Sequence, residues 1–260
     1  MEPIEQALKK AREQRRAMGV PASSEGAIPN FGAPVAVAYT QTKVIPLKPT
    51  VLERNRVVAT QLTHPVTDIF RSLRAQVLQG LTKLGKTSLG ITSVGEGEGK
   101  TLTAVNLAIA IAMDVNQTVL LVDADLRNPG IAKCLGVKPD LGLSDYLSGR
   151  ASVSECLINP GLERLSVLPS KDRVGNSAEL LASPQMAQLA RELKGRYPDR
   201  IIIYDLPPVL SVGDTLGFLP SVEATLLVVR DGAAKASDLK RVVSLLGEYN
   251  LIGTVLNAAG

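Results

Sequence analysis

Six short apolar runs, separated for the most part by helical stretches, dominate the sequence after residue 60. They are Leu89–Val94, Val119–Val122, Leu165–Leu168, Ile201–Tyr204, Ala224–Val229 and Ile252–Leu256. Runs this short suit strands that are buried on both faces of a sheet. Strands that alternate with helices form right-handed βαβ units. The pattern therefore predicts an α/β fold with an open, mostly parallel sheet and helices on both faces.

The chain before this pattern divides into two predicted segments. Residues 1–18 have the spacing of an amphipathic helix, with an apolar stripe that includes Ile4 and Leu8 and a basic remainder. Such a helix docks on a partner or an anionic membrane surface, or it is simply solvated, and the sequence leaves these alternatives open. Residues 19–60 are rich in Pro, Gly, Ala, Ser and Thr and predict a flexible linker, so the main domain is expected at 61–260.

Charge and composition exclude several classes of protein. The first 60 residues hold 9 basic and 5 acidic residues, and the remaining 200 hold 20 of each, so the body is neutral. A neutral body without tryptophan argues against a nucleic-acid surface. No apolar run reaches the roughly 18 residues of a membrane span, and no signal peptide is evident. Cys134, Cys156 and His64 lack metal-binding spacing, so we expect a reducing, cytoplasmic setting.

The first apolar run leads into a glycine-rich segment, T-S-V-G-E-G-E-G-K-T at Thr92–Thr101, which a helical stretch follows. Its glycines let the backbone turn N–H groups inward, and a helix start favours a phosphate. Lys100 can reach the β- and γ-phosphates, and the Thr101 hydroxyl can ligate Mg²⁺. The common pattern has glycine where Val94 stands, and a plain turn is the alternative. The predicted nucleotide contacts here are Gly95, Glu96, Gly97, Glu98, Gly99, Lys100, Thr101 and Leu102.

Acidic residues follow two further apolar runs. Asp123, Asp125 and Arg127 come directly after the second run, and Asp205 ends the fourth. Two carboxylates two residues apart repel each other unless a cation or hydrogen bonds accommodate them, and a phosphate-bound Mg²⁺ would do so. Ligands of open α/β sheets lie beyond the carboxyl ends of the strands, where these residues fall. Any one of them alone could instead cap a helix.

These three segments resemble the Walker A, Walker A′ and Walker B motifs of bacterial tyrosine kinases, the catalytic units of capsular and exopolysaccharide systems. The resemblance covers residues 60–260 and includes the segments Gly142–Gly149, Asn176–Leu181 and Gly253–Asn257. MinD and ParA ATPases share this P-loop fold, but they usually carry a second lysine early in the loop. No lysine stands in the corresponding residues, 93–95, of this chain.

The resemblance implies a Mg-ATP-dependent protein tyrosine kinase that regulates polysaccharide polymerisation or export. Lys100 would stabilise charge on the transferred phosphoryl group, and Thr101, Asp123 and Asp205 would be the magnesium side of the site. Asp123 would also accept the tyrosine proton. Asp125 would assist placement of metal or substrate, and Arg127 would neutralise phosphate or hold Asp125. Asn257 matches a position that contacts adenine, or it caps a turn. Asp214, which follows the Asp205 segment, receives no role.

The resemblance also implies partners. A D-x-x-R-x-x-R helix after Pro65 would place Asp68, Arg71 and Arg74 at the interface of a ring of subunits, although a solvated face with a local Asp68–Arg71 pair is the alternative. The opposite face is expected to be buried through Val66, Ile69, Phe70, Leu73, Val77 and Leu81. The activator would be a membrane polysaccharide co-polymerase, which would recruit the chain to the inner face of the membrane.

One feature departs from the family. Bacterial tyrosine kinases usually end in closely spaced tyrosines, whereas the five tyrosines of this chain are dispersed and the sequence stops at Asn257-Ala-Ala-Gly260. Three alternatives stay open: the tail is missing from this sequence, the kinase acts on tyrosines of other proteins, or the domain is an ATP-dependent regulator. Among the tyrosines of this chain, Tyr39 in the predicted linker is expected to be the most accessible acceptor. The second functional hypothesis is a MinD- or ParA-like ATPase switch that positions a membrane-associated partner without phosphorylating it.

Overall fold

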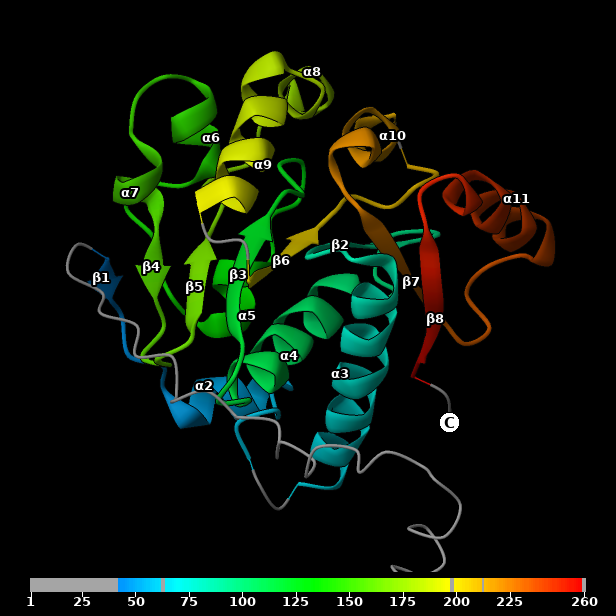
Figure 1. Cartoon of the computed structure of the whole chain (residues 1–260), viewed down its shortest axis with the longest axis horizontal. Coiled ribbons are helices and arrows are strands. Elements are labelled where there is room, and N and C mark those ends of the chain that lie inside the picture. The colour runs from blue at the N-terminus through cyan, green and yellow to red at the C-terminus, as the bar shows by residue number, and fades with distance from the viewer. Residues whose placement is uncertain (1–41, 62–63, 197–198, 212, 259–260) are drawn as a thin grey trace, which may run out of the picture. The chain divides into compact units, whose positions relative to one another are not determined.

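The computed structural model describes residues 42–61, 64–196, 199–211 and 213–258. Its centre is a sheet of eight strands in the order β1-β4-β5-β3-β6-β2-β7-β8 (Figure 1). Six neighbouring strands run parallel: β5 (Leu165–Leu168), β3 (Thr118–Asp123), β6 (Arg200–Asp205), β2 (Ser88–Ser93), β7 (Ala224–Arg230) and β8 (Leu251–Asn257). They coincide with the six apolar runs to within one residue at each end, so the predicted strands are confirmed.

Two short strands extend the sheet beyond β5, and the sequence pattern did not reveal them. β4 (Ile158–Asn159) pairs with β5 in the antiparallel direction, and β1 (Lys43–Val44) pairs with β4 in the parallel direction. A strand of two residues has no recognisable alternation. The sheet is therefore mostly parallel, as predicted, with its antiparallel pairing confined to one edge.

Helices cover both faces of the sheet (Figure 1). Within β3, Val119 and Leu121 pack into one apolar cluster and Leu120 and Val122 into the other, because neighbouring side chains of a strand point to opposite faces. The first cluster includes α2 (Pro49–Arg54), α3 (Pro65–Leu84), α4 (Lys100–Ala112) and α5 (Ile131–Leu135). The second includes α6 (Leu143–Leu147), α7 (Val153–Cys156), α8 (Ser177–Leu181), α9 (Pro184–Arg196), α10 (Asp214–Phe218), the 3-10 turn η1 (Leu219–Ser221) and α11 (Ala236–Gly247).

The ordered domain begins earlier than predicted. Residues 42–60 were expected to be linker, yet they contain β1 and α2, and Val57, Val58 and Ala59 are buried. The N–H groups of Val58 and Ala59 donate to Asn106 Oδ1 of α4 at 2.8 and 3.0 Å, and Asn106 Nδ2 donates to the Arg56 carbonyl at 3.2 Å. The Asn106 side chain, rather than a neighbouring strand or a turn of helix, accepts the hydrogen bonds of these backbone N–H groups. The sequence of this segment therefore shows no helix or strand periodicity. The predicted helix at 1–18 and residues 19–41 lie outside the described residues.

Helix α3 has the predicted place but not the whole predicted buried face. Val77 and Leu81 are buried and Phe70 and Leu73 are partly buried, whereas Val66 is 37% and Ile69 64% exposed. The apolar stripe continues past the part of the helix that the core covers.

The charged face of α3 is already engaged within the chain. Asp68 and Arg71 form an exposed pair at 2.6 Å, as the local-pair alternative expects. Arg74 Nη1 donates to the Ala110 carbonyl of α4 at 3.0 Å, so this arginine helps to hold the two helices together. A ring interface through these three residues stays a prediction.

Two observations bear on membrane recruitment. Residues 42–60, which are packed on the domain, hold four of the nine basic residues in the first 60 but only one of the five acidic ones. Most of the positive excess therefore lies on the ordered segment rather than before it. Across the described ranges, no helix has the length and hydropathy to cross a bilayer.

Candidate active site

A loop at residues 94–99 connects the end of β2 to the start of α4. Gly97 and Gly99 have φ angles of 72° and 92°, which favour glycine. A Cβ atom on Gly99 would lie 2.1 Å from Asn257 Nδ2, so a side chain would also clash with the end of β8. Two of the three glycines predicted to shape a phosphate loop, Gly97 and Gly99, therefore stand where the backbone requires glycine.

Two residues predicted to contact nucleotide hold this loop in shape. Glu98 is 3% exposed, and its Oε1 atom accepts a hydrogen bond from the Gly95 N–H at 2.9 Å. Asn257 Nδ2 donates to the Glu98 carbonyl at 2.9 Å, which ties the loop to the end of β8. The contact of Asn257 with adenine stays a prediction. Both side chains have a structural role, which the sequence analysis offered as an alternative for Asn257 but did not indicate for Glu98.

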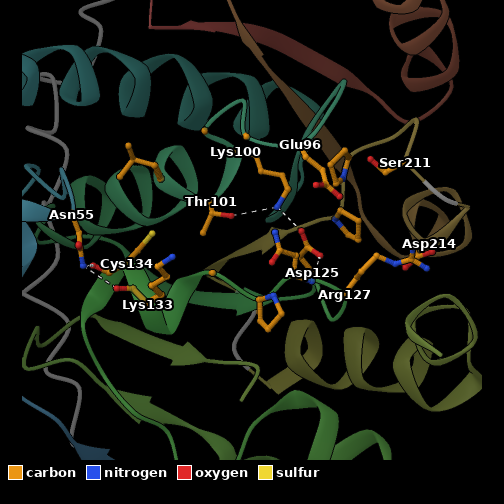
Figure 2. A pocket seen from close by; sticks show the side chains of 18 residues that line it. Asn55, Glu96, Lys100, Thr101, Asp125, Arg127, Lys133, Cys134, Ser211 and Asp214 are labelled. Atoms are coloured by element: carbon orange, nitrogen blue, oxygen red, sulfur yellow. Dashed lines mark hydrogen bonds and ion pairs between the residues drawn. The ribbon is translucent and has the colours of Figure 1, made fainter. Parts of the chain in front are cut away.

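Lys100 lies at the start of α4 and joins the loop to two carboxylates. Its Nζ atom lies 2.6 Å from Asp125 Oδ2, 3.6 Å from Asp205 Oδ1 and 3.3 Å from Thr101 Oγ1. Burial alone would lower the pKa of this lysine, but Asp205 and then Asp125 outweigh burial and raise it. Lys100 is therefore a fixed positive charge in the site (Figure 2).

Asp205 ends β6 directly beside Asp123 at the end of β3, because the two residues are register partners. Its Oδ2 atom accepts a hydrogen bond from Thr101 Oγ1 at 2.6 Å, and its Oδ1 atom has no hydrogen bond with any described residue. Burial raises the pKa of Asp205 above its ordinary value, although the nearby Lys100 opposes the shift.

The two carboxylate oxygens of Asp123 have different surroundings. Oδ2 accepts hydrogen bonds from the N–H groups of Gly130 and Ile131, at 3.1 and 3.0 Å, where α5 begins. The helix-cap alternative is thus correct for one oxygen. Oδ1 is buried and has no hydrogen bond within the described part of the chain. Burial and then the Asp205 charge raise the pKa of Asp123 well above its ordinary value.

The next two predicted residues leave β3 in different directions. Asp125 is 2% exposed, accepts from Lys100, and also accepts from the Asn128 N–H at 2.9 Å. Arg127 is exposed, and its side chain extends away from Lys100 toward Asp214 (Figure 2). Lys100, not Arg127, is the cation paired with Asp125, so the prediction that Arg127 holds Asp125 is wrong.

A cavity of about 390 Å³ lies beside these residues; Lys100, Thr101 and Asp125 line it, whereas Asp123 and Asp205 are fully buried and do not. Predicted residues that line it are Glu96, Gly97, Gly99, Lys100, Thr101, Leu102, Asp125 and Arg127. Sequence reasoning missed Asn55, Lys133 and Cys134, which line the side of the cavity that lies away from Asp214 (Figure 2). Asn55 Nδ2 donates to the carbonyls of Lys133 and Cys134 at 2.9 and 3.1 Å. In the sequence, only the apolar Val57-Val58-Ala59 segment that follows Asn55 indicated that this part of the chain packs on the domain.

The charge balance of the site fits a divalent cation. The buried carboxylates of Asp123, Asp125 and Asp205 face one buried ammonium group, and an oxygen on two of them lacks a hydrogen bond. Among the described residues, no group of three acidic, cysteine or histidine side chains could enclose a metal by itself. A Mg²⁺ ion would therefore need phosphate and water oxygens beside protein ligands, as is usual at phosphate-binding loops.

The fold and the loop together define a P-loop nucleotide-binding protein, and comparison with known proteins defines its family. Residues 89–235 match the AAA domain family model. The chain is 33% identical over 172 residues to the tyrosine-protein kinase CpsD of Streptococcus pneumoniae serotype 4 (strain ATCC BAA-334 / TIGR4), covering 65% of this chain and 74% of that one. It is 29% identical over 208 residues to the tyrosine-protein kinase YwqD of Bacillus subtilis (strain 168), covering 79% and 86%. The chain belongs to the bacterial tyrosine-protein kinases, within the AAA domain family.

Solved structures agree with this assignment. The kinase domain of Escherichia coli tyrosine kinase ETK superposes with a TM-score of 0.71 at 27% identity, covering 84% of this chain and 91% of that one. MinD from Pyrococcus horikoshii OT3, solved with Mg-ADP, gives a TM-score of 0.58 at 26% identity, covering 66% and 70%. Some relatives are much longer, and the chain spans 27% of the tyrosine-protein kinase wzc of Salmonella typhi.

Proposed function

We propose that this chain is a Mg-ATP-dependent protein tyrosine kinase that regulates capsular or exopolysaccharide polymerisation and export. The names of its relatives support tyrosine phosphorylation, and the Mg-ADP in the MinD structure supports a magnesium nucleotide as ligand. The relatives do not favour the alternative of an ATPase switch without kinase activity.

The observation that carries the proposal is the position of Lys100 between Asp125 and Asp205. Its ammonium group lies where the loop and the start of α4 favour phosphate, and it is held there by carboxylates. Phosphate oxygens of ATP would replace Asp125 as its partner, because both are anions and the lysine keeps its charge. Positioning and charge stabilisation of this kind supply most of the catalysis in phosphoryl transfer.

The remaining carboxylates have separate proposed roles. Thr101 and Asp205 would hold Mg²⁺, whose charge would neutralise the phosphates. Asp123 would accept the proton of the tyrosine hydroxyl through Oδ1, the oxygen without a hydrogen bond. Its raised pKa suits a general base better than an ordinary aspartate, since the most effective base has a pKa near the working pH.

The proposed partners follow from the family. A membrane polysaccharide co-polymerase would activate the kinase and bring it to the inner face of the membrane. Self-association into a ring would use Asp68 and Arg71 at the exposed end of α3, and Arg74 would support the helix from within through Ala110.

The test is phosphate transfer from Mg-ATP to an added tyrosine polymer by the full-length chain, read with an antibody against phosphotyrosine. Wild type and Lys83→Met, which changes an exposed lysine of α3, should form phosphotyrosine, and Lys100→Met should not. ATP hydrolysis by wild type without phosphotyrosine, in the presence of the membrane fraction and the acceptor, would favour the ATPase switch instead.

A further inference from the structure

Asp214 is a buried carboxylate that the proposed mechanism does not use. It is 1% exposed, although it lines the same cavity as Lys100. Its Oδ2 atom accepts a hydrogen bond from Ser177 Oγ at 2.5 Å, and its Oδ1 atom has no hydrogen bond with any described residue. A buried carboxyl oxygen without a hydrogen bond costs free energy and calls for an explanation, such as a partner that arrives during function.

The position of Asp214 is fixed from two directions. Ser177, at the start of α8, is fully buried beneath it. The next residue, Thr215, donates through Oγ1 to the Pro207 carbonyl at 2.6 Å, and Thr92 Oγ1 of β2 donates to the same carbonyl at 2.7 Å. Asp214 is therefore tied to the segment that follows Asp205 and to the strand that leads into the phosphate loop.

Arg127 is a candidate donor for Asp214 Oδ1. It lines the same cavity and makes no hydrogen bond or ion pair with any described residue. Figure 2 shows its side chain extending toward Asp214. The backbone supports this closeness, because the Leu126 carbonyl accepts a hydrogen bond from the Val174 N–H at 2.9 Å, three residues before Ser177.

The other cations of the cavity are unsuitable partners. Lys100 is paired with Asp125, and Lys133 lies with Asn55 on the opposite side of the cavity (Figure 2). A guanidinium group also suits a carboxylate better than an ammonium group does, because its fork of N–H donors matches the two oxygens.

We infer that Asp214 is a positioning residue that receives the Arg127 guanidinium on Oδ1 when the cavity is filled. Ser177 keeps the other oxygen, and the pair then fixes Arg127 in the wall of the cavity that Lys100 also lines. Arg127 follows β3 and Asp214 follows β6, so the contact would join the two segments that carry Asp123 and Asp205. The inference deepens the proposed kinase function and rests on it.

A double-mutant cycle on the full-length chain tests the inference. Asp214→Asn, Arg127→Ala and the double variant are compared with wild type by kcat and KM for phosphotyrosine formation, Mg-ADP affinity and melting temperature. Each single change should lower kcat about tenfold or more, and the double variant should match Arg127→Ala within about twofold, because residues that act as one unit are not additive. Mg-ADP affinity should change by less than about threefold, since Lys100 and the loop bind the phosphates.

Two further variants keep the test decisive. Asp140→Asn removes an exposed carboxylate that pairs with Lys43 and should behave as wild type. Asp214→Glu keeps the charge, and in the wild-type background it should retain more activity than Asp214→Asn. If Asp214→Asn does not fold, Asp214→Glu takes its place in the cycle.

The outcomes separate this inference from the proposed function. Effects of the two single changes that multiply in the double variant would show that Asp214 acts without Arg127 and would overturn the inference. A loss of activity that follows the melting temperature alone would reduce Asp214 to a structural link between α8 and α10. If wild type forms no phosphotyrosine, the proposed function fails, and the same variants are compared by their rate of ATP hydrolysis. A double variant as active as Arg127→Ala then supports the pairing. Effects of the single changes that multiply in the double variant reject it.

Discussion

Carboxylates at the two ends of the central sheet have opposite surroundings. Glu223 precedes β7 at the amino ends of the parallel strands, and its Oε2 atom accepts hydrogen bonds from the Thr87 and Ser88 N–H groups at 3.1 and 3.2 Å. Lys194 also donates to it, and Lys86 lies 3.6 Å away. Burial alone would raise the pKa of Glu223, but the hydrogen bond from Lys194 and those from the backbone lower it.

At the carboxyl ends of the same strands, Asp123 and Asp205 lie side by side with raised pKa values, and each has one oxygen without a hydrogen bond to a described residue. The difference indicates a structural role for the carboxylate at the amino end and supports the ligand site proposed at the carboxyl end. Glu223 is satisfied within the fold, whereas the aspartates keep an unfavourable arrangement that a cation and phosphates would relieve. Perturbed carboxylates of this kind cluster at functional sites.

The largest expected effect contrasts the lysines at the two ends. Lys100→Met should lower Mg-ATP affinity and turnover by about a hundredfold or more, because it removes the charge that meets the phosphates. Lys194→Met removes the lysine beside Glu223 and should leave both quantities unchanged. Calorimetric titration and a turnover assay on both variants provide the comparison. Equal losses in the two variants would break the distinction between the ends.

The next effect separates binding from chemistry within the active end. Asp123→Asn should reduce phosphotyrosine formation by about a hundredfold to ten-thousandfold, the usual contribution of a general base, while Mg-ATP affinity changes little. Its melting temperature should not fall below that of wild type at neutral pH, because the change removes a buried charge. Steady-state kinetics and calorimetry check both points. Full turnover in this variant would remove Asp123 from the catalytic role.

The opposite pattern is expected for Glu223→Gln. The amide cannot accept from Lys194 and two backbone N–H groups as the carboxylate does, so the free energy of unfolding should fall by about 2 kcal/mol. Kinase activity and Mg-ATP affinity should be those of wild type. Urea unfolding and the phosphotyrosine assay measure the two quantities. A large loss of activity without a loss of stability would place Glu223 in the function rather than in the scaffold.

The smallest effect is a difference in the sign of the pH dependence. The pKa of Glu223 is lowered in the fold, so its stabilisation is present above its ordinary value of 4.5 and is lost as pH falls through the folded pKa. The pKa of Asp123 is raised, so its cost appears as pH rises from its ordinary value of 3.8 through the folded pKa.

Raising the pH from about 4 to 7 should therefore widen the stability deficit of Glu223→Gln and improve Asp123→Asn relative to wild type. Urea unfolding of the three proteins across this range gives the comparison. If the free energy of unfolding of both variants, relative to wild type, changed with pH in the same direction, the assignment of opposite pKa shifts would be contradicted.

Much of the active end could be predicted because its signals are local in sequence. Short apolar runs marked the six parallel strands, and the residues that follow them, such as Lys100, Asp123 and Asp205, necessarily meet at one edge of a parallel sheet. The glycines at 97 and 99 were readable as well, because a tight loop before a helix requires them.

The parts that escaped prediction depend on partners distant in sequence. Residues 57–59 are ordered by Asn106 of α4, whose side chain no local pattern connects to them. Glu98 looked like a phosphate contact because it stands in the loop, yet its carboxylate folds under the loop to bind Gly95. Asp214 could be noticed but not interpreted, since its partner Ser177 lies 37 residues away on another helix.

Calorimetric titration of Mg-ADP into the full-length chain, repeated with EDTA in place of magnesium, tests the central claim most directly. The account predicts binding of one nucleotide per chain that depends on Mg²⁺ and is weakened by Asp205→Asn, because this carboxylate would hold the ion beside Thr101. Glu223→Gln should bind as wild type does. Nucleotide binding of equal strength with EDTA, or an equal loss in both variants, would contradict a magnesium nucleotide site at the carboxyl end of the sheet.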